Sequence, residues 1–247
     1  MSSFGRSPYS QQQSGVNPLD YAYADGSPAV AAFFNAVYLW MTVGLALTGS
    51  IAWWVSTKPA ILASVFKGPT LIILFIAEIL LVGVISAAVQ RISASVATLL
   101  FLVYSALNGF TLSGIFVAYS LPSLAGAFIA SAVMFGAMSL YGKFTGSDLT
   151  GMGKIAFMGL IGIIVASVVN IFLQSPALVW IVSYVGVAVF LGLTAYDTQR
   201  LKQVAISTSG DAAMAGRYAI NGALMLYLDF LNLFLMLVQI MGNSRRN

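Results

Sequence analysis

Two aspartates in the last third of the chain are the residues best suited to carry chemistry. Asp197 ends an apolar run over about 177–197, and Asp229 lies within the next run, between Leu228 and Phe230. A carboxylate that stays charged at the centre of a membrane span costs about 2.5–3.5 kcal/mol on insertion scales. Two such residues on consecutive apolar segments therefore call for a function.

The chemistry open to such a pair is the binding of protons or hard cations. Two carboxyl groups within hydrogen-bond reach cannot both ionise cheaply, so they share a proton. Without that proton they would repel each other and attract a cation such as Ca²⁺, for which oxygen ligands are suited. Spacing leaves open whether the two meet. Asp229 lies about 15 Å into its span if the span begins near residue 219, and helix tilt would have to close that offset.

The composition indicates an all-α, polytopic membrane protein. Of its 247 residues, 60% are hydrophobic and only 7% are charged, whereas soluble domains carry about 25% charged residues. The absence of cysteine excludes disulfides and thiolate chemistry, and the absence of histidine leaves acid–base work to carboxylates. A formal net charge of +4 is too small to suggest nucleic acid as a partner. The expected partners are the lipid bilayer, protons and calcium ions, with no cofactor.

Seven stretches are long and apolar enough to span a membrane, a length of about 20 residues. They cover about 31–55, 70–89, 96–118, 123–141, 155–173, 177–197 and 219–241. The connection over about 198–217 is expected to be the longest and most polar. Residues 198–201 contain no helix breaker, so we expect the helix to continue past Asp197 and to hold it on a defined face. The chain therefore divides into a flexible polar tail (1–29), a seven-helix membrane domain (30–243) and a short basic tail (244–247).

The distribution of basic residues favours a cytoplasmic N-terminus and a periplasmic C-terminus. Seven basic residues fall on the side of the N-terminus: Arg6, Arg91, Lys143, Lys154, Arg200, Lys202 and Arg217. Four fall on the other side: Lys58, Lys67, Arg245 and Arg246.

Other polar residues within the spans add to the candidate site. Asn221, Asp229 and Asn232 share one face of the seventh span, and Glu78 lies inside the second. We interpret Glu78, Asn221 and Asn232 as a candidate cation path. The alternative for such residues, and for Ser167, Asn170 and Gln174 in the fifth span, is hydrogen bonding between helices. Small residues such as Gly109 and Gly136 are expected at close helix contacts.

Three motifs resemble the Bax inhibitor-1 (TMBIM, lifeguard) family in its bacterial inner-membrane branch. The segments 192–199 (GLTAYDTQ) and 223–234 (ALMLYLDFLNLF) match the signatures of its last two spans, and 135–142 (FGAMSLYG) is typical of bacterial members. The resemblance covers roughly residues 30–243. It implies a seventh helix that is central and surrounded by the other six.

The resemblance also implies a pH-sensitive calcium leak of the bacterial inner membrane, controlled by a paired aspartate sensor. That sensor and gate maps onto Asp197 and Asp229, which are also the candidate Ca²⁺ ligands. In relatives an arginine near the inner end of the second span can latch onto the first aspartate, and Arg91 is the matching cation here. Relatives also have a glutamate to which Glu78 corresponds.

Two other functions remain open from the sequence. Some relatives regulate protein quality control, so the chain could be a non-conducting regulator that binds a membrane protease complex. Two aspartates on consecutive spans also suit an intramembrane aspartyl protease. That chemistry needs Gly-x-Gly-Asp, however, and this chain has Leu-Tyr-Leu-Asp at 226–229. We therefore expect a protein that is not an enzyme.

Overall fold

The computed structural model describes residues 27–243, and all regular secondary structure in this part of the chain is helical. The helices are α2 (Pro28–Ser56), α3 (Pro59–Phe66), α4 (Thr70–Ala88), α5 (Ala94–Leu112), α6 (Ile115–Ala118), α7 (Leu121–Phe144), α8 (Thr150–Leu173), α9 (Pro176–Ser207) and α10 (Ala212–Asn243). Seven segments are long and apolar enough to cross a membrane, with α5 and α6 counted as one. The all-α fold with seven candidate spans is therefore confirmed. The terminal tails, apart from residues 27–29, and Arg6, Arg245 and Arg246 lie outside the described residues.

Serine side chains fix where four of the spans begin. Ser27, Ser93, Ser120 and Ser175 each precede a helix and accept a hydrogen bond from the backbone N–H three residues later. Such a cap satisfies one of the free donors at a helix N-terminus. Proline follows three of these serines within the first two helical positions, where its missing N–H costs nothing.

The connection between the sixth and seventh spans differs from the expectation. We expected a long polar segment over about 198–217, but α9 runs to Ser207 and α10 begins at Ala212. Only residues 208–211 connect the two helices, and Asp211 ends the turn by accepting a hydrogen bond from Met214 N. The expected length of the connection was wrong because it followed hydropathy. The expected continuation of the helix past Asp197, which followed from the absence of a helix breaker, is confirmed.

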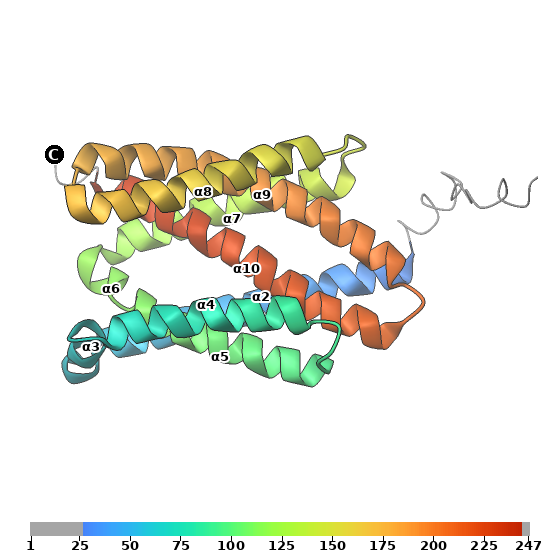
Figure 1. Ribbon diagram of the computed structural model, residues 1–247, viewed down its shortest axis with the longest axis horizontal. Coiled ribbons are helices and arrows are strands. Elements are labelled where there is room, and N and C mark those ends of the chain that lie inside the picture. Colours follow the sequence, from blue (N-terminus) through green and yellow to red (C-terminus); the bar gives the residue numbers. More distant parts are fainter. Residues whose placement is uncertain (1–26, 244–247) are drawn as a thin grey trace, which may run out of the picture.

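The long helices form two groups of three with α10 between them. In Figure 1, α2, α4 and α5 lie on one side, α7, α8 and α9 lie on the other, and α10 crosses diagonally from one end of the bundle to the other. The contacts agree, because α10 packs against α2, α4, α5, α7 and α9, while α8 packs on α9. The helix is also the most buried of the seven.

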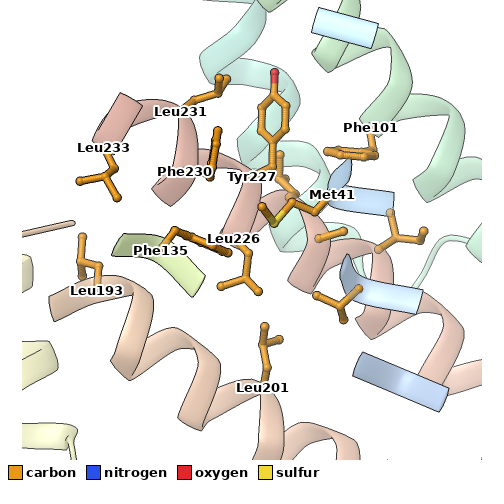
Figure 2. Packing of buried hydrophobic residues seen from close by; sticks show 14 of the residues in the cluster. Met41, Phe101, Phe135, Leu193, Leu201, Leu226, Tyr227, Phe230, Leu231 and Leu233 are labelled. Carbon is orange, nitrogen blue, oxygen red and sulfur yellow. The ribbon is translucent and has the colours of Figure 1, made fainter. Parts of the chain in front are cut away.

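The core is built around α10, which is apolar on nearly every side. Leu224, Leu226, Tyr227 and Leu233 are almost fully buried. Figure 2 shows side chains of both groups converging on them, among them Met41 and Phe101 on one side and Leu193 and Leu201 on the other. A helix that is apolar all round is stable only when it is enclosed.

Basic residues meet at one end of the bundle, as the proposed topology requires. Lys202 Nζ donates to the carbonyl oxygen of Lys143 at 3.1 Å, and Lys143 Nζ lies 4.7 Å from the ring centre of Phe34, near the start of α2. Arg217 Nη1 donates to the Gln90 carbonyl oxygen at 2.9 Å. The ends of α7 and α9 therefore lie beside the start of α2.

Candidate functional site

The two aspartates lie on consecutive helices, at different distances from the turn that joins them. Asp197 lies about 15 Å from the last residue of α9, and Asp229 about 26 Å from the first residue of α10, at 1.5 Å per residue. Parallel axes would leave them on different levels. α10 is tilted across the bundle (Figure 1), and both aspartates line one cavity, so the packing of the helices closes this offset.

Both carboxyl groups line one cavity between α8, α9 and α10. The cavity has a volume of about 500 Å³. Its polar and charged lining consists of Asp197, Asp229, Asn232, Lys154 and Arg200, together with Tyr196. The charge of Asp197 acts on Asp229, so the two groups interact electrostatically across this space. The structure thus brings together the pair that the sequence could not place.

Asp229 is a buried carboxyl group that lacks a hydrogen-bond donor. Its side chain is 5% exposed, and Oδ2 receives no hydrogen bond from residues 27–243. A buried acceptor without a donor is costly. Asp148, on the loop before α8, shows the ordinary case: it is exposed and accepts hydrogen bonds from the backbone and hydroxyl of Thr150. These bonds hold the pKa of Asp148 below its usual value.

Asp197 is half-buried and has a cation on its own helix. Arg200, three residues further along α9, is the cation among residues 27–243 whose charge acts on it. Residues at this spacing are neighbours on a helix surface. Arg91, the candidate latch, is exposed in the turn after α4, and the structure shows no ion pair between it and Asp197. The three-residue spacing of Asp197 and Arg200 in the sequence would have predicted this pairing, which the sequence analysis missed.

The other candidate residues divide between the two sides of α10. Asn232 lines the cavity and donates from Nδ2 to the Leu228 carbonyl oxygen at 2.8 Å. Asn221 is half-buried and is not part of the cavity lining. Glu78 is 8% exposed on α4, where its Oε1 accepts a hydrogen bond from Thr111 of α5 at 2.9 Å. Glu78 therefore belongs to the opposite three-helix group and does not join the aspartates.

One buried hydrogen-bonded group escaped the sequence analysis. Thr48 Oγ1 donates to the Ser105 carbonyl oxygen at 2.8 Å and lies 2.7 Å from the Tyr227 hydroxyl. Because a threonine has one hydroxyl hydrogen, Tyr227 must be the donor in the second bond. This bond ties α10 to α2 and α5, on the side opposite the aspartates. No sequence motif marks a hydrogen bond between residues so far apart.

The acidic residues do not form a closed metal site. Within the described part of the chain, no group of three or more Asp, Glu, His or Cys side chains could hold a metal ion. A resident Ca²⁺ takes 6–8 oxygen ligands. The two carboxyl groups and the amide of Asn232 supply fewer ligands than such a site needs.

Comparison with known proteins agrees with this architecture. The sequence profile of the family described as "Inhibitor of apoptosis-promoting Bax1" matches residues 30–246. The inner membrane protein YbhL of Escherichia coli K12 is 53% identical over 216 residues, which cover 86% of this chain and 92% of YbhL. A Deinococcus radiodurans protein is 44% identical over 87% of this chain and 92% of its own length. A membrane protein of Streptococcus pyogenes serotype M1 is 43% identical over 68% of this chain and 72% of its own length. With seven candidate spans and these relatives, the chain belongs to the Bax inhibitor-1 family of multi-pass membrane proteins.

Proposed function

We propose that this protein is a pH-sensitive calcium leak channel of the inner membrane, in which Asp197 and Asp229 share the gating proton. The observation that carries the proposal is the Oδ2 of Asp229, which is buried without a donor, on a residue that lines a cavity together with a second carboxyl group. One proton between the two groups would supply the missing donor and leave a single negative charge. The protein is then a channel and not an enzyme.

Loss of the shared proton provides the opening force. Two negative charges in one cavity of the membrane domain repel each other, and the repulsion acts between α9 and α10. The same charges attract a hard cation into the cavity. Ca²⁺ flux should therefore rise as the pH increases. Arg91 and Glu78 have secondary roles in this proposal, as a latch in another conformation and as a cation site on the far side of α10.

The test is Ca²⁺ flux into proteoliposomes that hold the purified protein, measured over a range of pH. Asp197→Asn and Asp229→Asn each remove the proton-sharing partner while keeping the size of the side chain. Each should flatten the pH profile several-fold. Asp148→Asn is the matched control, because Asp148 is an exposed loop acid, and it should keep the wild-type profile.

Two results would contradict the proposal. An unchanged pH profile of Ca²⁺ flux in both variants would show that the aspartates do not form the gate. Absence of any flux from the wild-type protein would favour the non-conducting regulator, which predicts instead a membrane protease or similar complex that co-purifies.

A further inference from the structure

A second cavity lies further along the same three helices. It has a volume of about 590 Å³ and is found where α8 ends and α9 begins, opposite the end at which the basic residues meet. Its polar lining comes from Ser167 and Asn170 of α8, Gln174, Gln239 of α10, and Tyr119. Neither the proposed gate nor the aspartate cavity uses these residues.

Two amide side chains in this cavity have hydrogen-bonding capacity that the protein leaves unused. Asn170 Oδ1 accepts from the Ser175 backbone N–H at 2.9 Å, and Gln239 Oε1 accepts from Ser183 Oγ at 2.8 Å. Their NH₂ groups have no partner within residues 27–243, and neither group is enclosed by protein. Hydrocarbon cannot satisfy such donors. Water or a hydrated ion can, so this cavity is best understood as water-filled.

The two cavities are stacked on the same faces of α8, α9 and α10. On α10, Asp229 and Asn232 line the first cavity, and Met236 and Gln239 line the second. These four residues follow one another at three- and four-residue spacing, so they share one face of the helix. Gln239 lies about 15 Å beyond Asp229 at 1.5 Å per residue.

Met236, which lines the second cavity, lies between the lining positions of the two cavities along α10. Met236 packs against Gly186 of α9, and a Cβ added to Gly186 would come within 2.7 Å of the Met236 sulfur. The glycine therefore lets the thioether lie directly against the backbone of α9. Methionine is unbranched and has three rotatable bonds, so it can leave this position without a change of fold.

We propose that ions cross this protein between α8, α9 and α10, from the aspartate cavity past Met236 into an amide-lined vestibule formed by Asn170 and Gln239. The vestibule holds a cation with its hydration water, because it offers amide groups and no fixed charge. Met236 closes the path when α9 and α10 are together. This inference rests on the proposed leak function and extends it to a route.

Thiol labelling tests the vestibule without depending on flux. The chain has no cysteine, so single-cysteine variants have no background. Asn170→Cys and Gln239→Cys should react with a cationic methanethiosulfonate reagent present on both sides of proteoliposomes, because the reagent needs a thiolate in water. Val169→Cys is the control, since Val169 adjoins Asn170 and faces outward, 44% exposed. Equal labelling of all three variants, read by intact mass, would overturn the vestibule.

Flux through the same vesicles tests the route. Met236→Ala should raise Ca²⁺ leak several-fold at the pH of lowest wild-type flux, and Met236→Leu should keep it low. Met158→Ala is the matched control, because Met158 is 71% exposed on the outer face of α8. Reagent bound at Asn170→Cys should reduce the flux. If wild-type flux is present but Met236→Ala behaves like Met158→Ala, the route is wrong and the aspartate gate stands. If neither the wild-type protein nor any variant conducts, the proposed leak function is wrong, and the labelling experiment alone shows whether the vestibule holds water.

Discussion

At the scale of single residues, Tyr227 and Asp229 make contacts on opposite sides of α10. Successive helix residues are about 100° apart, so side chains two positions apart point to nearly opposite sides. The Tyr227 hydroxyl donates to Thr48 in one three-helix group, while Asp229 faces the cavity formed with the other group. The helix is therefore anchored on one side and can respond to charge on the other.

Removing the Tyr227 hydroxyl should loosen that anchor without changing the gate. Tyr227→Phe deletes the donor to Thr48 but keeps the ring, which packs edge-on against Phe101 and Tyr104. We expect a loss of about 0.6–1.7 kcal/mol in the free energy of unfolding, the range for hydrogen bonds between membrane helices. Thermal unfolding in detergent measures it. Tyr184→Phe, at an exposed tyrosine on α9, should have no effect, and an equal loss in both variants would exclude the anchor.

At the scale of helices, close approach is concentrated at particular glycines. A Cβ on Gly142 of α7 would overlap the Ala195 carbonyl group of α9, whereas a Cβ on Gly136 would meet nothing within 4 Å. Gly142 is thus the position in its motif that lets α7 approach the segment that carries Asp197. The expectation of close packing was wrong for Gly136 and right for Gly109, where a Cβ would meet Ile51.

These two glycines provide a matched pair of alanine substitutions. Gly142→Ala must push α7 away from α9, and the shift should lower the thermal stability and disturb the pH profile of Ca²⁺ flux. We expect a cost of about 1–3 kcal/mol, typical of overpacking. Gly136→Ala should be neutral or slightly stabilising, because alanine is the better helix former. Similar unfolding temperatures for both variants would show that α7 can move at no cost.

The helices also show which features of the fold the sequence predicts and which it does not. Hydropathy located all seven spans because each needs a long apolar stretch, and burial cost singled out Asp229. Hydropathy ended the sixth apolar run at Asp197, but the absence of a helix breaker after it correctly predicted that the helix continues, and α9 extends ten residues further. The proximity of Asp197 and Asp229 depends on how α9 packs against α10, and the bond from Tyr227 to Thr48 joins residues far apart in the chain. Both contacts depend on how the helices pack against one another, and local sequence patterns do not predict this packing.

At the scale of the whole molecule, α10 joins two three-helix groups that have few other contacts. Between the groups, the principal remaining packing is that of α2 with α9. Near the aspartates, side-chain hydrogen bonds also link the two groups. The Tyr38 hydroxyl of α2 lies 2.6 Å from Ser139 Oγ of α7, and Ser139 Oγ lies 3.0 Å from Thr198 Oγ1 of α9. In the proposed gate, repulsion between Asp197 and Asp229 would act across the α9–α10 contact. Because Tyr227 anchors α10 to α2 and α5, we expect the group of α7, α8 and α9 to be the part that moves relative to α10.

Distances between spin labels can test this movement, since the chain has no cysteine to remove. A pair at Leu99→Cys on α5 and Leu140→Cys on α7 spans the two groups, and both positions are exposed. Their separation should increase as the pH rises, because loss of the shared proton leaves two like charges between the groups. A pair at Leu99→Cys and Val84→Cys lies within one group and should keep its separation. Adding Asp229→Asn should abolish the change in the first pair. A pH-dependent separation that survives Asp229→Asn would place the pH sensor elsewhere in the protein.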